Sequence, residues 1–217
     1  MVYKSGDSEI RTDIMLYVNG IPLVNLELKD PTSFSQTWYD AYSQIKYYEK
    51  EIPELYKYVQ IGVAAEQTAR YFPIVSWQEE VKNHLWREGS ARDDIDAIIE
   101  MLTPERLLDI IRNYIFYRVE MGEATKVIAR YMQYRASEKI VPRVLNNLEG
   151  IEDKKKGLIW HWQGSGKTLT MIFAANKLYH QKQLENPTIF FIVNRNELED
   201  QLLDEFFSLD IIYWFHK

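Results

Sequence analysis

The sequence predicts an α/β fold in three successive zones, which cover residues 1–76, 77–149 and 150–217. The first zone alternates apolar, β-prone runs with one long helical segment, which is typical of a mixed sheet with helices. The second zone has helical periodicity throughout and is expected to be a helical linker. In the third zone a strand-like run, a glycine-rich loop and a helix follow one another, an order that predicts the start of a parallel sheet.

Two apolar runs in the first zone predict a β-hairpin. Residues 14–18 and 23–28 flank Asn19-Gly20, a dipeptide that strongly favours a tight turn between strands. The other elements expected in this zone are a helix at 35–51 and strands at 58–64 and 71–75.

The second zone is expected to contain several helices. Thr103 is suited to cap a helix whose first residue is Pro104, a position that favours proline. The apolar stripe that follows at helical spacing consists of Leu107, Leu108, Ile111, Ile115 and Phe116. Further helices are expected at 123–132 and 136–148, and Pro142 predicts a kink or a later start in the second of them.

The third zone follows a polar, charged linker at 149–156. Its apolar runs and helical segments alternate in the way that is typical of a parallel sheet covered by helices. The expected order is a strand at 158–160, a glycine-rich loop, a helix at 168–182, a strand at 188–193 and a helix at 197–207. Only two strands of such a sheet are therefore expected.

Composition and charge narrow the classes of function. The absence of cysteine excludes a disulfide framework, a thiolate zinc site and a cysteine nucleophile, and it fits a reducing cytoplasm. No uninterrupted apolar run approaches the roughly 18 residues of a membrane-spanning helix, and the first residues lack the apolar core of a signal peptide. The net charge of −6 argues mildly against a surface that tracks DNA phosphates, although carboxylates that hold a metal contribute to it.

Two carboxylates and a lysine are expected to converge in the first zone. Asp13 begins the first strand of the expected hairpin, while Glu27 and Lys29 lie at the end of the second. Carboxylate oxygens are ligands for Mg²⁺ in proteins, and a nearby lysine can steer a nucleophile or balance developing charge. The pattern predicts a site for metal-assisted phosphodiester hydrolysis; the alternative is an exposed edge strand with alternating side chains.

The alternation of side chains along a strand sets a condition on this site. A two-residue turn would pair Asp13 with Leu26, whose side chain points away from that of Glu27. A three-residue loop would pair Asp13 with Asn25 and make Glu27 its diagonal neighbour, roughly 7 Å away. We therefore expect a loop of odd length or a bulge, and a hairpin with neither would contradict the site.

The third zone contains a candidate phosphate-binding loop, Trp-Gln-Gly-Ser-Gly-Lys-Thr at residues 162–168. Glycines let backbone N–H groups point at phosphate oxygens, and the N-terminus of the following helix adds favourable partial charge. Lys167 is expected to reach the β- and γ-phosphates of ATP, and the Thr168 hydroxyl to bind Mg²⁺. The other expected nucleotide-binding residues of the loop are Gly164, Ser165 and Gly166. His161 replaces the glycine that usually opens this pattern.

These motifs resemble those of one known family in the same order along the chain. Residues 19–24, which lead into 27–31, resemble the nuclease core of the restriction (motor) subunits of type I restriction-modification enzymes. The following helix resembles it too, because Gln44 and Tyr48 lie one helical turn apart. By this resemblance Asp13 and Glu27 are metal ligands and Lys29 is the catalytic lysine. Gln44 and Tyr48 would support the metal site and the DNA backbone.

Two further segments resemble those of helicase-like motors. Residues 130–136 resemble the segment that contacts adenine, and the Gln133 amide can both donate to and accept from a base edge. Residues 193–202 resemble the next motor motif, which is associated with DNA tracking, although Asn194 stands where the family usually has aspartate.

The resemblance covers residues 3–207 and implies a specific organisation. It implies a PD-(D/E)xK-type nuclease core at 1–76, a helical linker at 77–149 and the start of a RecA-like first lobe of a superfamily 2 helicase at 150–217. It further implies Mg²⁺-dependent cleavage of double-stranded DNA coupled to ATP-driven translocation in the cytoplasm. The implied partners are methyltransferase and specificity subunits.

The chain looks shorter than the family at both ends. Two alternatives therefore stay open: a truncated, inactive remnant that binds DNA or partner subunits, and a helicase-associated nuclease of another system.

Overall fold

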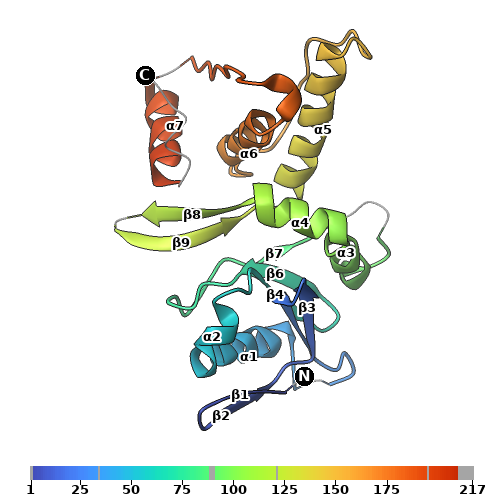
Figure 1. Cartoon of the computed structure of the whole chain (residues 1–217), viewed down its shortest axis with the longest axis vertical. Coiled ribbons are helices and arrows are strands. Elements are labelled where there is room, and N and C mark those ends of the chain that lie inside the picture. Colours follow the sequence, from blue (N-terminus) through green and yellow to red (C-terminus); the bar gives the residue numbers. More distant parts are fainter. Residues whose placement is uncertain (1, 34, 88–90, 121, 195, 210–217) are drawn as a thin grey trace. The chain divides into compact units, whose positions relative to one another are not determined.

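The computed structural model of the chain describes residues 2–33, 35–87, 91–120, 122–194 and 196–209. They form two compact units, residues 1–111 and 112–217 (Figure 1). The boundary falls inside the zone at 77–149 that the sequence analysis assigns to a helical linker. In the structure that zone contains a short strand at 84–85 and a helix at 94–101, both in the first unit, and a helix at 104–113 that crosses the boundary. A hairpin and a long helix follow in the second unit.

The first unit is built around one mixed sheet. The strands of this unit are β1 (Val2–Ser5), β2 (Ser8–Arg11), β3 (Ile14–Val18), β4 (Ile21–Leu28), β5 (Ile61–Ala65), β6 (Ala69–Pro73) and β7 (His84–Leu85). The helices that begin in this unit are α1 (Trp38–Glu51), α2 (Pro53–Tyr56), α3 (Asp94–Met101) and α4 (Pro104–Asn113). Strands β3 to β7 form the sheet in sequence order, with β4 and β5 parallel and the other neighbours antiparallel. Strands β1 and β2 form a separate hairpin, which the sequence analysis did not predict.

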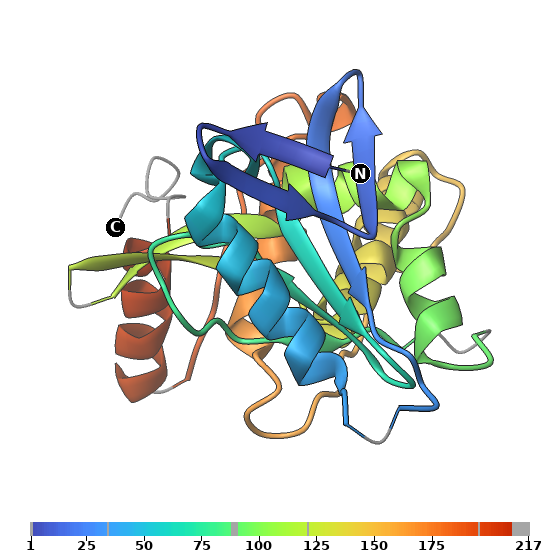
Figure 2. The same cartoon turned by 90° about the horizontal axis from the view of Figure 1, so that it is seen from below.

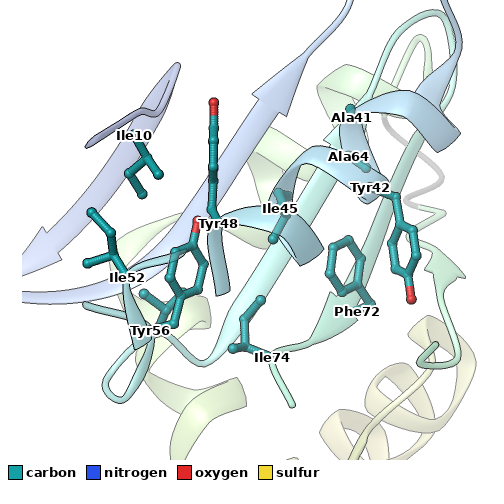
Figure 3. Close-up of a cluster of buried hydrophobic side chains, with 11 residues drawn as sticks. Ile10, Ala41, Tyr42, Ile45, Tyr48, Ile52, Tyr56, Ala64, Phe72 and Ile74 are labelled. Carbon is teal, nitrogen blue, oxygen red and sulfur yellow. The ribbon is translucent and has the colours of Figure 1, made fainter. Parts of the chain in front are cut away.

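Helix α1 connects the two parallel strands and covers one face of the sheet (Figure 2). Its start is fixed by a capping box, in which Thr37 and Asp40 satisfy each other's backbone N–H groups. The predicted helix at 35–51 is thus confirmed, with a start three residues later. The apolar face of α1 packs on the sheet, and Tyr42 and Phe72 meet edge to face with ring centroids 4.8 Å apart (Figure 3).

The second unit contains a hairpin that the sequence analysis assigned to helices. Strands β8 (Ile115–Glu120) and β9 (Glu123–Ile128) pair along their whole length. The predicted helix at 123–132 is therefore wrong, and Ile115 and Phe116 belong to a strand rather than to a helical stripe. Both segments are rich in β-branched and aromatic residues, which favour strands, and Gly122 supplies the positive φ of 85° at the turn.

Three helices follow in the second unit: α5 (Tyr131–Leu148), α6 (Lys167–Tyr179) and α7 (Asn196–Ser208). A short 3₁₀ turn, Lys182–Leu184, lies between the last two. The predicted helices at 168–182 and 197–207 are confirmed within a few residues. The predicted later start at Pro142 is wrong, because α5 begins at Tyr131 and contains this proline. Ile172 of α6 packs in a small core with Leu202 and Phe206 of α7.

The two strands predicted for a parallel sheet are not formed. The described residues at 158–160 and 188–193 pair with no other strand, and Leu158 and Ile192 are 92% and 91% exposed. Strands of a parallel sheet are stabilised by neighbours on both sides and by helices on both faces. These apolar runs have no strand neighbour in the part of the chain that the structure describes, and so they stay irregular.

None of the described helices combines the length and the apolar character that a bilayer-crossing helix needs.

Candidate functional site

The β3–β4 hairpin contains the bulge that the site requires. The strands join through a two-residue turn, Asn19-Gly20, in which both φ angles are positive, at 51° and 81°. The register then shifts by one residue beyond Leu16, so that Ile14 pairs with Leu26. The expectation of a bulge or an odd loop is confirmed by the bulge, whereas the three-residue loop is wrong.

The bulge brings Asp13 directly opposite Glu27. The Asp13 N–H donates to Glu27 Oε1 at 3.2 Å, and the Leu28 N–H donates to Asp13 Oδ2 at 2.9 Å. The predicted pairing of Asp13 with Asn25 is wrong, because Asn25 pairs with Met15. The extra residue lies on β4 rather than in the turn, which moves the partner of Asp13 two residues along the same face.

The two carboxylates differ in their surroundings. Asp13 is exposed, whereas Glu27 is 0% exposed and its Oε2 has no hydrogen-bond partner among the described residues. Burial, and then the negative charge of Asp13, raises the pKa of Glu27 to about 8. A buried acceptor that is next to a like charge and has no donor is stabilised by a proton or by a cation.

Lys29, Gln44 and Tyr48 form a chain of hydrogen bonds beside the carboxylates. Lys29 Nζ donates to Gln44 Oε1, and Gln44 Nε2 donates to the Tyr48 hydroxyl. The hydroxyl in turn donates to the Arg11 carbonyl at 2.6 Å. Burial raises the pKa of the Tyr48 phenol, which keeps this donor protonated. The five predicted residues of this site therefore lie in one place, at the end of β4 and along one face of α1.

The donor set is compatible with a hard divalent cation. Among the described residues no group of three or more His, Cys, Asp or Glu side chains could hold a metal ion. Mg²⁺ is usually held by only one or two carboxylates and keeps water or substrate oxygens as its other ligands. Asp13 and Glu27, with the unpartnered Glu27 Oε2, fit such a site.

Asn25 enters the sequence prediction only as the pairing partner of Asp13, and Tyr56 does not enter it. Asn25 is fully buried on the same face of β4 as Glu27, and its Nδ2 donates to the Tyr56 hydroxyl at 2.5 Å. The sequence does contain a signal for this contact, because Asn25 stands between the apolar residues Val24 and Leu26. A buried side-chain amide needs a hydrogen-bond partner.

The second unit holds the predicted phosphate-binding loop. Gly164 and Gly166 have positive φ angles of 77° and 80°, and Gly166 is the N-cap of α6. A Cβ at 166 would displace the end of the Gln133 side chain, and the positive φ is a conformation that favours glycine over other residues. Lys167 Nζ donates to the carbonyls of His161 at 2.8 Å and Trp162 at 3.2 Å.

Gln133 lies against this loop rather than apart from it. Its Nε2 donates to the Gly166 carbonyl at 3.2 Å, and its Oε1 accepts from the Arg130 N–H at 2.8 Å. Ser165 is a buried residue of the loop, and Thr168 lies half-buried in the first turn of α6. The structure thus joins the predicted nucleotide-binding residues in one cluster. Contact between Gln133 and an adenine base stays a prediction.

Two family models match the chain, one in each unit. Residues 1–81 match the model described as type I restriction enzyme R protein N terminus. Residues 132–212 match the model described as SWI2/SNF2 ATPase. The matches define a protein class in which an R-protein N-terminal region precedes the beginning of a helicase-like ATPase.

Individual relatives agree with these matches. The chain is 37% identical over 209 residues to the putative type I restriction enzyme MjaVIIIP endonuclease subunit of Methanocaldococcus jannaschii, covering 94% of this chain and 20% of that protein. It is 41% identical over 214 residues to the putative MjaVIIP endonuclease subunit of the same organism, covering 92% and 19%. It is 35% identical over 206 residues to the HindI endonuclease subunit of Haemophilus influenzae, covering 90% and 20%.

The chain belongs to the family of type I restriction enzyme endonuclease subunits. It spans about a fifth of the length of the curated relatives it matches.

Proposed function

We propose that the first unit is a PD-(D/E)xK-type nuclease that cleaves phosphodiester bonds of double-stranded DNA with Mg²⁺. The observation that carries the proposal is the pairing of Asp13 with Glu27, whose Oε2 is buried without a donor. Membership in a family of endonuclease subunits supports the same reaction class.

Each residue of this site has a separate proposed role. Asp13 and Glu27 would hold the cation, and the N–H groups of Asp13 and Leu28 fix the orientation of the two carboxylates. When bound, Mg²⁺ polarises the scissile phosphate as a Lewis acid. Lys29 carries the positive charge that faces the developing negative charge of the phosphate.

Gln44 and Tyr48 act through Lys29. The Gln44 amide oxygen accepts from Lys29 Nζ, while its Nε2 is held by the Tyr48 hydroxyl, so the lysine has one favoured direction. Positioning of this kind matters because small displacements of a charged group strongly reduce its effect on a transition state.

We further propose that the second unit is the start of a RecA-like lobe that binds ATP in the longer enzyme. Gly164, Ser165 and Gly166 would cradle phosphate oxygens, and Thr168 would contact Mg²⁺. Lys167 would exchange the carbonyls of His161 and Trp162 for phosphate oxygens. ATP-driven translocation, methyltransferase and specificity subunits as partners, and a cytoplasmic location belong to the same proposal.

A second candidate is a non-catalytic role in which the chain binds DNA or partner subunits. The irregular, exposed runs at 158–160 and 188–193 favour it for the ATPase half.

A plasmid-nicking assay separates the two candidates. Supercoiled plasmid is incubated with the wild-type chain, Asp13→Ala and Lys29→Ala, each with Mg²⁺ and with a chelator. The nuclease proposal predicts Mg²⁺-dependent nicking by the wild type and a loss of about 100-fold or more in both variants. Equal background nicking in all three would leave the non-catalytic role. Neighbouring genes for methyltransferase and specificity subunits distinguish type I restriction from another helicase-associated system.

A further inference from the structure

Arg70 lies on the same face of the sheet as Glu27. Ala64 of β5 pairs with Glu27 on one side and with Arg70 on the other, and paired residues direct their side chains to the same face. Because neighbouring strands are about 4.8 Å apart, the main chains of Glu27 and Arg70 are separated by about 10 Å. That spacing corresponds to about three nucleotides of rise along one DNA strand, at about 3.4 Å each.

The Arg70 guanidinium is held in a fixed orientation. It stacks on the Trp38 ring with 4.6 Å from the guanidinium carbon to the ring centroid. Its Nη1 donates to Asn83 Oδ1 at 2.9 Å. The side chain is half-buried, and it is restricted by one partner in α1 and one in the loop before β7. Arg70 is therefore ordered before any ligand arrives.

The partners of Arg70 do not neutralise its charge. The Trp38 ring and the Asn83 amide are both neutral, and Arg70 Nε is buried without a hydrogen-bond partner among the described residues. By contrast, Arg92 of the same unit pairs with the Asp96 carboxylate at 2.6 Å. A guanidinium keeps its charge at all physiological pH values, and a half-buried charge is costly without a counter-charge. The arrangement at Arg70 is suited to an anion supplied from outside.

The surroundings of Arg70 connect it with the candidate site. Trp38 is the first residue of α1, and Lys29 donates a hydrogen bond to Gln44 of the same helix. Hydrogen bonds from Thr37 lower the pKa of Asp40, and the positive charge of Lys29 adds to this effect. Asp40 itself accepts from Thr37 N–H at 2.6 Å and from Thr37 Oγ1 at 3.1 Å, so this carboxylate is engaged in the cap.

We propose that Arg70 is a DNA-binding residue that contacts a backbone phosphate flanking the one cleaved at Asp13, Glu27 and Lys29. The inference rests on the proposed nuclease function for its choice of ligand. Arg70 positions the strand and takes no part in bond breaking.

Fluorescence anisotropy with a labelled duplex of mixed sequence tests this contact in a chelator, where no cleavage occurs. Affinity is measured over a range of salt concentrations for the wild-type chain, Arg70→Gln, Arg70→Lys and Arg92→Gln. We expect Arg70→Gln to weaken binding about tenfold and to lower the slope of log affinity against log salt by about one. Arg70→Lys keeps the charge and should retain most of the slope. Arg92→Gln removes the same charge from an exposed, carboxylate-paired site and should bind like the wild type.

Thermal melts of the same four proteins separate a folding defect from a binding defect. If Arg70→Gln unfolds early, Arg70→Met replaces it, because methionine keeps an aliphatic chain against Trp38 and removes the charge; we expect the same loss of slope. A salt slope that is equal for Arg70→Gln and Arg92→Gln overturns the inference, and so does a wild-type chain that binds no DNA at low salt. Cleavage in the plasmid assay with an unaltered Arg70→Gln slope would refute this contact and leave the nuclease. A slope that depends on Arg70, without cleavage in the plasmid assay, would support this contact and contradict the nuclease proposal.

Discussion

Asp13 and Glu27 face each other across the β3–β4 hairpin, and the N–H of the first donates to the side chain of the second at 3.2 Å. The aspartate is exposed and the glutamate is fully buried, so the pair reaches from the surface into the sheet. Because the second oxygen of Glu27 has no donor, the pair gains most from a cation that both carboxylates share.

The raised pKa of Glu27 predicts how stability depends on pH. The folded chain keeps this proton up to about pH 8, whereas the unfolded chain loses it near pH 4.5. Stability without metal should therefore fall as pH rises from about 4.5 to about 8, because the folded state binds more protons than the unfolded state. Melting temperatures of the wild type and Glu27→Gln in chelator measure this effect. A pH dependence that is the same in both proteins would contradict the role of Glu27.

The raised pKa of Glu27 also predicts that cation binding releases a proton. Mg²⁺ has to displace the proton of Glu27, so its affinity should be higher at pH 8.5 than at pH 6. Calorimetric titration in two buffers of different ionisation enthalpy gives the number of protons released. The prediction is up to one proton per chain at pH 6 to 7 for the wild type and fewer for Glu27→Gln.

Tyr48 should matter for activity more than for folding. Tyr48→Phe removes the donor to the Arg11 carbonyl and frees the Gln44 amide, at a cost of roughly 1 kcal/mol in stability. We expect a loss of about tenfold or more in nicking, because Lys29 is no longer held in one direction. Chemical denaturation and the nicking rate are measured on the same samples, with the exposed Tyr47→Phe as the matched control.

Gly166 should accept no side chain. Gly166→Ala places a Cβ against Gln133 and in a left-handed backbone conformation, which should cost about 1–2 kcal/mol or more. Gln133→Ala alone also removes its hydrogen bonds to Arg130 and Gly166, so the overlap is measured with the two single variants and the double variant. Thermal melts of all three variants and the wild type check this. If the two single costs simply add in the double variant, the overlap has no energetic weight.

Local patterns were sufficient for much of the first unit. Alternation of apolar residues around Asn19-Gly20 predicted the hairpin, and strand parity predicted a loop of odd length or a bulge, of which the structure has the bulge. Sequence spacing could not tell whether the extra residue lies in the turn or on β4. That choice depends on how β4 packs beside β5, a contact between residues far apart in the chain, and it moved the partner of Asp13 from Asn25 to Glu27.

The second unit was harder to predict because a short apolar run fits both the 3.6-residue period of a helix and the two-residue period of a strand. Residues 115–128 were assigned to helices, although their β-branched and aromatic residues and Gly122 favoured a hairpin. The runs at 158–160 and 188–193 have strand composition, but a parallel strand needs neighbours that these described residues do not find. The contact between Gln133 and the loop at 164–166 joins segments about thirty residues apart, which no local pattern reports.

The most direct test of the metal centre is a count of bound Mn²⁺, a spectroscopic probe for Mg²⁺ sites, by electron paramagnetic resonance of the free ion without nucleotide. We predict one site in the wild type that is lost in both Asp13→Ala and Glu27→Ala and retained in Lys29→Ala. The same Mn²⁺ titration curve in the wild type and both carboxylate variants would contradict the assignment of Asp13 and Glu27 as the metal-binding pair.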